Sequence, residues 1–290
     1  MENTQTVGVV GLGLMGEVLA GRLMAAGFGV LGYDIDPGKN AHLVSLGGRA
    51  AGSPAEIAAC DRIVLAVFNT DQVEEVVEQA LLPAAKPGTI VLCTSTCDPD
   101  RIATLGARLA GSAIRFLETP VSGTSEQVRQ GDGVGLIGGD RAAAADAVAV
   151  LDALFPRRFH IGEVGDGGRA KLAVNLILGL NRLALAEGLT FAERMGLEPA
   201  AFLEVAKGSA SYSQVMETKG PKMLRRDFSP EGRVKQTLKD VHMMLNQGER
   251  LGQDLPLLRV HCDVLEACVR AGDAERDNSI IVEEIRRRKR

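Results

Sequence analysis

A glycine-rich turn near the start of the chain constrains its fold most. Gly11, Gly13 and Gly16 are spaced as G-x-G-x-x-G. The apolar run Val7–Val10 precedes them, and the helical pattern Met15–Ala26 follows them. In such a turn the first glycine permits a tight bend, the second lets the backbone approach a pyrophosphate, and the third lets helix and strand pack closely. Because the phosphates would meet the N–H groups of a helix start, this context predicts a dinucleotide-binding loop.

An acidic residue stands where the next strand ends. Asp34 follows the run Val30–Tyr33, and a carboxylate there accepts hydrogen bonds from the adenosine ribose and repels a 2′-phosphate. The neighbours Ile35 and Asp36 supply no arginine for that phosphate. We therefore expect NAD as the cofactor, with NADP disfavoured. The alternative is that Asp34 only opens the following turn, which Asp36 can serve alone.

Short apolar runs alternate with helical patterns up to residue 163. The runs predict strands at Val7–Val10, Val30–Tyr33, Ile63–Phe68, Thr89–Cys93, Arg115–Leu117, Val134–Ile137 and Arg158–Ile161. The helical patterns are Met15–Ala26, Gly38–Leu46, Val73–Leu81, Pro99–Leu109 and Arg141–Leu154. This alternation predicts an α/β domain, residues 1–163, with the parallel sheet of a Rossmann fold that binds NAD.

Only helical patterns follow the glycine-rich stretch 162–168. They are Gly167–Gly188, Pro199–Lys207, Gln214–Lys222, Val234–Leu251, Leu257–Ala271 and Asn278–Arg288. We expect residues 164–290 to form an all-helical domain for substrate binding and dimerisation, with Asp166 as a cap of its first helix.

Composition excludes several classes of protein. The net charge of −4 argues against a nucleic-acid partner, and the basic run 286–290 is interpreted as a solvated helix end rather than a polyanion-binding tail. The sequence has no stretch of 18 apolar residues, so no membrane span is predicted. It also has no leader pattern, so no signal peptide is expected. The five cysteines are scattered, and no Cys/His grouping has the spacing of zinc ligands, so no metal site is predicted. We expect a protein of the cytoplasm with reduced thiols.

Three later groups carry chemistry. Ser122 and Gly123 follow a strand and offer a hydroxyl and an open backbone N–H to a carboxylate, although an ordinary turn has the same residues. Lys171 and Asn175 lie four residues apart and therefore on one helix face, among apolar neighbours. Lys239-Asp240 lies in a later helix, where an exposed charge pair is the alternative.

Taken in order, four segments resemble the β-hydroxyacid dehydrogenases, the group of 3-hydroxyisobutyrate dehydrogenase, tartronate semialdehyde reductase and glyoxylate/succinic semialdehyde reductases. They are Gly11–Gly16 with Leu14 and Met15, then Pro120–Gly123, then Gly165 through Lys171 to Asn175, and Lys239-Asp240. The resemblance covers nearly the whole chain. It implies hydride transfer between NAD and a small β-hydroxyacid or semialdehyde.

The resemblance also implies roles for single residues. Lys171 would be the general acid/base, Ser122 and Gly123 would hold the carboxylate, and Asn175 would orient the substrate or the lysine. A lysine base must overcome an ordinary pKa of about 10.4, and burial and a positive nicotinamide both favour its neutral form. The positions matching the family's cofactor contacts are Val67, Phe68, Val73, Thr96 and Lys239, the last closing over the cofactor.

Four residues in three places depart from the family pattern. Thr124 replaces a second glycine and would add a methyl and a hydroxyl to the pocket. Glu118-Thr119 replaces Asp-Ala. Gly232 replaces an aromatic residue, which predicts extra space or a more mobile loop. A substrate larger or more anionic than 3-hydroxyisobutyrate is therefore compatible with the chain.

Three alternatives remain at the level of sequence. An imine reductase has the same architecture, but related enzymes have Asp or Tyr at the position of Lys171. A 6-phosphogluconate dehydrogenase would need a histidine where Val174 stands. A non-catalytic NAD-binding scaffold would have lost the lysine. The length of the apolar stripe on the first long helix predicts a homodimer or homotetramer.

Overall fold

The chain folds into two compact units. The first unit ends at Lys171 and the second begins at Leu172. The computed structural model describes residues 5–288. Lys289 and Arg290, which belong to the basic run, and the first four residues lie outside the described part.

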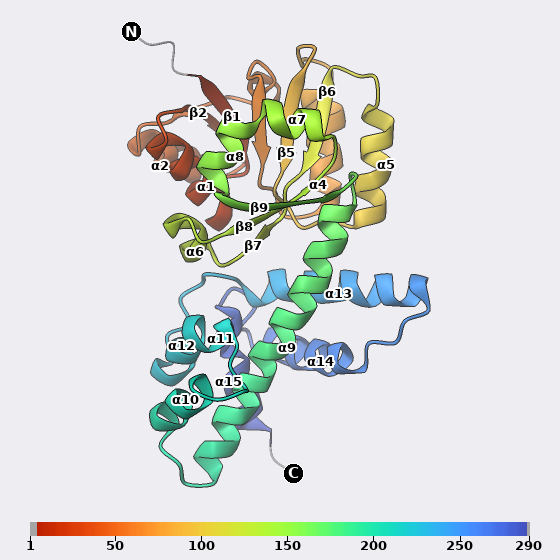
Figure 1. The fold of residues 1–290 in the computed structure, drawn as a ribbon. Helices are drawn as coiled ribbons and strands as arrows, with labels where there is room; N and C mark the ends of the chain where they lie inside the picture. Colours follow the sequence, from red (N-terminus) through yellow and green to blue (C-terminus); the bar gives the residue numbers. More distant parts are fainter. Residues whose placement is uncertain (1–4, 289–290) are drawn as a thin grey trace. The chain divides into compact units, whose positions relative to one another are not determined.

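A nine-stranded sheet organises the described part of the first unit (Figure 1). Its strands are β1 (Thr6–Val10), β2 (Gly29–Tyr33), β3 (Arg49–Ala50), β4 (Arg62–Leu65), β5 (Thr89–Cys93), β6 (Ile114–Glu118), β7 (Val121–Ser122), β8 (Val134–Gly138) and β9 (Arg157–Gly162). The order is β3-β2-β1-β4-β5-β6-β8-β7, with β9 paired to β8. From β3 to β6 all pairings are parallel, so the predicted Rossmann sheet is confirmed.

Strands β2 and β3 lie on one side of β1, and strands β4 to β6 lie on its other side. The strand order therefore changes direction between β1 and β4. In open α/β sheets, ligands bind at such a switch point, beyond the carboxyl ends of the strands. The loops after β1, β4 and β5 therefore meet at the edge of the sheet where a nucleotide is expected.

Some strand predictions were incomplete. The two-residue strands β3 and β7 were missed, because such short runs have no readable period. The predicted strand Ile63–Phe68 ends at Leu65, and its last residues form the loop after β4. The predicted parallel sheet also becomes antiparallel where β8 pairs with β6 and β7.

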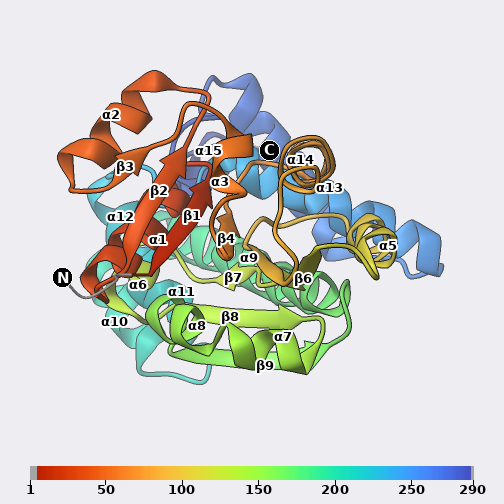
Figure 2. The same cartoon turned by 90° about the horizontal axis from the view of Figure 1, so that it is seen from above.

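Helices cover both faces of the sheet (Figure 2). The core on one face is completed by α1 (Leu14–Ala25), α2 (Pro37–Ser45), α6 (Ser125–Gln130), α7 (Arg141–Asp146) and α8 (Val148–Leu154). The core on the other face is completed by α3 (Pro54–Ile57), α4 (Thr70–Glu75), the π-helix η1 (Val76–Leu81) and α5 (Pro99–Leu109). This two-faced burial explains why the central strands are continuous aliphatic runs.

The second unit is helical, as predicted. Its elements are the greater part of α9 (Asp166–Arg194), then α10 (Pro199–Lys207), α11 (Gln214–Thr218), α12 (Gly220–Arg225), α13 (Val234–Leu251), α14 (Pro256–Arg270), the 3₁₀ turn η2 (Asn278–Ile280) and α15 (Ile281–Arg287). The single helix predicted at Gln214–Lys222 is two helices, because Pro221 starts a new one after Lys219.

The long helix α9 is apolar and long enough to cross a membrane by length and composition alone. Leu183, Ala186 and Leu189 on this helix are instead buried in the core of the helical unit. Core helices of globular proteins meet the same criterion, and one face of α9 is packed in this way.

Candidate active site

The loop Gly11–Gly16 has the geometry of a nucleotide cradle. Gly11 has φ +90°, and a Cβ on it would lie 2.5 Å from the carbonyl oxygen of Ala66. A Cβ on Gly16 would lie 1.9 Å from the carbonyl oxygen of Gly11. A Cβ on Gly13 would meet no atom within 4 Å, so the space in front of this residue is open. Helix α1 begins there with Gly13 as its N-cap and without a side-chain cap, which suits a pyrophosphate at this helix start.

Asp34 lies directly against this loop. Its Oδ2 accepts the N–H of Leu12 at 2.8 Å, and its Oδ1 accepts the N–H of Asp36 at 2.9 Å. Lys39, a residue that the sequence did not single out, lies with its ammonium 3.2 Å and 3.3 Å from the two oxygens. The side chain of Asp34 is 8% exposed. The carboxylate of Asp34, directly after β2, thus has the ammonium of Lys39 beside it.

The loops after β4 and β5 are joined to each other. Ser95 donates its hydroxyl to the carbonyl oxygen of Val67 at 2.7 Å, and Thr94 donates to that of Leu65 at the same distance. Phe68 is 41% exposed, whereas Val73 is fully buried in the core. Thr96, which follows Ser95 in the loop after β5, is half-buried. Of the residues expected around the nicotinamide, Val67, Phe68 and Thr96 therefore lie on the ligand edge of the sheet, and Val73 lies beneath it.

Lys171 lies in the second turn of α9, and a buried carboxylate fixes the start of this helix. Glu118, at the end of β6, is 1% exposed and accepts the N–H of Gly165 at 2.7 Å. Burial raises the pKa of Glu118 to about 7, against the lowering effect of backbone N–H donors such as that of Gly165. Lys171 itself is 6% exposed, so it is not the solvated surface lysine that most helical lysines are.

The expected cap of α9 was wrong. Asp166 is the first helical residue, and its Oδ2 accepts the N–H of Glu163 at 3.0 Å. The carboxylate that meets the helix start is that of Glu118, which is distant in sequence. Local capping patterns could not indicate it.

Ser122 is the last residue of β7, and Gly123 follows it. Ser122 pairs with Val134 of β8, and Gly123 has φ +143°, which favours glycine. Thr124 is the N-cap of α6: its hydroxyl accepts the N–H of Gln127 at 3.2 Å, and its own N–H donates to the Gln127 side chain at 2.9 Å. The hydroxyl of Thr124, which we expected to add polarity to the pocket, is thus committed to a capping box.

In the helical unit, Asn175 is held by Asp240. The Nδ2 of Asn175 donates to the Oδ2 of Asp240 at 3.1 Å, while its Oδ1 is buried and has no hydrogen-bond partner among the described residues. Lys239 lies 3.2 Å from the other oxygen of Asp240. Lys239 and Asp240 are therefore not a solvated surface pair, since their side chains are 17% and 10% exposed. The orientation of the Asn175 amide leaves its Oδ1 able to accept a hydrogen bond from a hydroxyl group.

The loop before α13 depends on a buried ion pair that the sequence analysis missed. Asp277 is fully buried and accepts the ammonium of Lys219 at 3.0 Å on both oxygens. Its Oδ2 also accepts the N–H groups of Glu231 and Gly232. Burial would raise the pKa of Asp277, but the Lys219 ammonium and backbone N–H donors hold it below its ordinary value. The loop at Gly232, for which extra mobility was one expectation, is pinned by this carboxylate.

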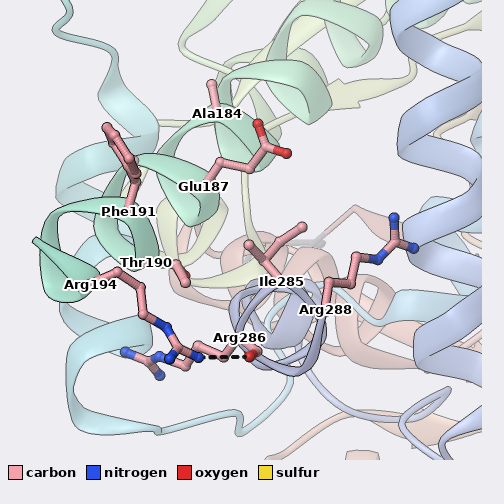
Figure 3. Close-up of a pocket in the computed structure, with 9 residues that line it drawn as sticks. Ala184, Glu187, Thr190, Phe191, Arg194, Ile285, Arg286 and Arg288 are labelled. Carbon is pink, nitrogen blue, oxygen red and sulfur yellow. Dashed lines mark hydrogen bonds between the residues drawn. The ribbon is translucent and has the colours of Figure 1, made fainter. Parts of the chain in front are cut away.

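The helical unit also has a hollow of about 870 Å³ between α9 and α15 (Figure 3). Glu187, Phe191 and Arg194 line it from α9, and Ile285, Arg286 and Arg288 line it from the C-terminal segment. None of these residues was predicted to bind a ligand. Its exposed Phe191 and arginines distinguish it from the glycine-rich nucleotide loop.

Comparison with known proteins agrees with both units. Residues 6–162 match the family model described as the NAD binding domain of 6-phosphogluconate dehydrogenase. Residues 165–285 match the model described as NAD-binding of NADP-dependent 3-hydroxyisobutyrate dehydrogenase.

Individual relatives cover nearly the whole chain. L-threonate dehydrogenase of Cupriavidus necator is 31% identical over 96% of this chain and 95% of that protein. The 2-hydroxy-3-oxopropionate reductase of Escherichia coli is 28% identical over 96% of each chain. The crystal structure of 3-hydroxyisobutyrate dehydrogenase from Salmonella typhimurium superposes with a TM-score of 0.88 at 28% identity, covering 96% of this chain and 99% of that one.

The sheet order and the glycine cradle define a Rossmann-type oxidoreductase that binds NAD. The chain belongs to the β-hydroxyacid dehydrogenase family. It is an enzyme that transfers a hydride between a nicotinamide cofactor and a small hydroxyacid or semialdehyde.

Proposed function

We propose that Lys171 is the proton-transfer residue of this oxidoreductase, and that Ser122 and Gly123 hold the substrate carboxylate. One observation carries the proposal: the buried carboxylate of Glu118 joins the end of β6 to the start of α9. Ser122 follows Glu118 by four residues, and Lys171 follows Gly165 by six. The same contact therefore anchors both segments that would meet the substrate, within one unit.

The proposed chemistry is proton exchange with the substrate hydroxyl. The cofactor supplies the hydride acceptor at nicotinamide C4. The neutral amine of Lys171, which is buried, takes the hydroxyl proton in oxidation and returns it in reduction. The hydroxyl of Ser122 and the N–H of Gly123 donate hydrogen bonds to the substrate carboxylate. The Oδ1 of Asn175 accepts a hydrogen bond from a substrate hydroxyl group.

Kinetics of Lys171 variants test this role. We expect Lys171→Ala to lower kcat by roughly 10²–10⁴-fold, the usual contribution of general acid–base catalysis. Lys171→Arg, which keeps the charge but cannot release a proton near neutral pH, should be impaired similarly. Lys86→Ala on the protein surface is the control. Full activity of Lys171→Ala, measured as NADH formation, would refute the role.

The substrate proposed first is a short polyhydroxylated acid such as threonate. The similarity to an L-threonate dehydrogenase supports it, as does the glycine at position 232, where the family usually has an aromatic side chain. The test is a kcat/KM comparison of threonate, glycerate, 3-hydroxyisobutyrate, 4-hydroxybutyrate and sulfonated analogues with each cofactor. A kcat/KM for 3-hydroxyisobutyrate above that for threonate would contradict this choice.

The proposed cofactor preference is NAD over NADP. Asp34 would repel a 2′-phosphate, and Lys39 acts in the opposite direction because its ammonium would attract one. We expect Asp34→Ser to lower the ratio of kcat/KM for NAD to that for NADP, and Lys39→Ala to raise it. A wild-type ratio below one would contradict the preference.

We further propose that α9 pairs with α9 of a second copy. Glu187, Phe191 and Arg194 lie at i, i+4 and i+7 and therefore form one stripe, of which Phe191 is 65% exposed (Figure 3). Two antiparallel copies would bury the phenylalanines and set Glu187 opposite Arg194 of the second copy.

Light scattering tests this assembly. Phe191→Glu should dissociate the oligomer, whereas Leu251→Glu, at a residue that is 78% exposed, should not. A wild-type monomer at micromolar concentration would contradict the proposal. The proposed location is the cytoplasm, which agrees with the five free, buried cysteines; cell fractionation tests it.

A further inference from the structure

A cluster of metal-binding side chains lies on the helical unit, apart from the residues assigned to the reaction. His242 comes from α13, and Cys262 and Glu266 come from α14, one turn apart. Their donor atoms all lie within 4.8 Å of one another. No spacing along the sequence indicates this cluster, because its members come from two helices.

The distances between the donor atoms are close to those of a tetrahedral site. The Nε2 of His242 lies 3.6 Å from the Oε1 of Glu266, and the Sγ of Cys262 lies 3.8 Å from the same oxygen. Zinc bonds of about 2.0–2.3 Å at tetrahedral angles place neighbouring ligand atoms roughly 3.3–3.6 Å apart. Both distances to Oε1 of Glu266 therefore exceed this range by no more than a few tenths of an ångström, and the third pair, Nε2 of His242 and Sγ of Cys262, lies within 4.8 Å.

The chemistry of the donors selects the kind of cation. An imidazole, a thiol and a carboxylate together suit Zn²⁺, whereas Mg²⁺ and Ca²⁺ prefer oxygen ligands alone. The second oxygen of Glu266 faces Arg270 at 3.7 Å, which leaves Oε1 directed to the cluster. The side chains of His242 and Glu266 are 51% and 42% exposed, so a fourth position is accessible to water.

We propose that His242, Cys262 and Glu266 form a binding site for Zn²⁺. The thiol proton of Cys262 leaves to solvent as the thiolate binds the ion. The bound ion ties α13 to α14. His242 follows Asp240 by two residues, so the ion would also restrain the part of α13 that holds Asn175.

The test uses tag-free full-length protein freed of metal by a chelator. Zn²⁺ is titrated in competition with a chromophoric chelator, and Co²⁺ is added separately as a spectroscopic probe. We expect one Zn²⁺ per chain and a thiolate-to-Co²⁺ charge-transfer band in the near ultraviolet. His242→Gln, Cys262→Ser and Glu266→Gln should each weaken Zn²⁺ binding by about tenfold or more, at least the effect of losing an outer-shell partner.

The chain offers matched controls. His42 is 53% exposed and lies 3.7 Å from Glu17, much as His242 lies beside Glu266. Cys60 is as exposed as Cys262, at 7%. His42→Gln and Cys60→Ser should bind Zn²⁺ like the wild type. Equal losses in the controls and the ligand variants, or a Co²⁺ band that persists in Cys262→Ser, would overturn the proposal; if Cys262→Ser does not fold, the exposed His242 and Glu266 variants decide it.

Discussion

The two units of this chain hold their buried polar groups in different ways. In the nucleotide-binding unit, the ligand edge is shaped by backbone: glycines at positions 11 and 16 allow contacts that no side chain would permit. In the helical unit, the loop before α13 is held by the buried charges of Lys219 and Asp277, which are 58 residues apart. The contact of Gly16 with Gly11 joins residues five positions apart, whereas the pair of Lys219 and Asp277 joins two distant segments.

The difference extends to the response of each unit to pH. The buried carboxyl of Glu118 has its pKa raised to about 7 by burial. In the helical unit, burial and the neighbouring Arg182 lower the pKa of His261 to about 3. The folded state favours the neutral form of both groups. The stability of the fold therefore falls as pH rises through the titration of Glu118, and it falls as pH drops through the titration of His261. Stability measurements on single variants can therefore separate the two units.

The largest effect is expected at the ion pair of the helical unit. Asp277→Asn leaves Lys219, which is 3% exposed, without its principal counter-charge. Removing one partner of a buried pair costs about 3–5 kcal/mol in the free energy of unfolding. Denaturant unfolding measures it, and the double variant with Lys219→Met should recover part of the loss. A loss below about 1 kcal/mol, the usual contribution of surface pairs, would show that the pair is not the anchor of this loop.

An intermediate effect is expected from His261. Its pKa is lowered in the folded state, so its contribution to stability is present above the unfolded pKa and is lost as pH falls from 6.5 towards 3. Relative to His261→Leu, the wild type should lose about 2.5 kcal/mol of unfolding free energy between about pH 7 and 4.5. The exposed His42→Leu serves as the control. Parallel pH profiles for the wild type and His261→Leu would contradict the neutral, buried imidazole.

A slightly smaller effect of opposite sign is expected from Glu118. Its pKa is raised in the folded state, so its contribution is full below the unfolded pKa of 4.5 and is lost as pH rises towards 7. Relative to Glu118→Gln, the wild type should lose about 2 kcal/mol between about pH 5.5 and 7.5. Glu126→Gln, at an exposed position of the same unit, should not alter the profile. A wild type that gains stability over this range relative to Glu118→Gln would show that the carboxylate is the preferred form.

The contrast also explains what the sequence could predict. The Rossmann fold and the position of the nucleotide loop follow from Gly11, Gly13, Gly16 and Asp34, whose spacing along the chain is set by the ligand. The helices α10 and α13 were predicted to the residue, since their apolar periods are regular. These are local signals.

Long-range partners were beyond such reasoning. Nothing near Glu118 indicates that it meets Gly165, and nothing near Lys219 indicates Asp277. Lys39 lies five residues after Asp34, beyond Ile35 and Asp36, the two positions where an adjacent phosphate-binding cation would be expected from the sequence. The roles of Lys171, Ser122, Gly123, Asn175 and Lys239 remain predictions whose tests are kinetic.

The tight contact between Gly16 and the carbonyl of Gly11 has a consequence for reading natural variation in this protein. A hydrogen replaced by a methyl group at either position would push the polypeptide out of the path that a pyrophosphate must follow, without altering charge or polarity. Glycine-to-alanine changes there look conservative in any substitution table. In a survey of variants, they should be ranked with losses of charged residues as changes that abolish nucleotide binding.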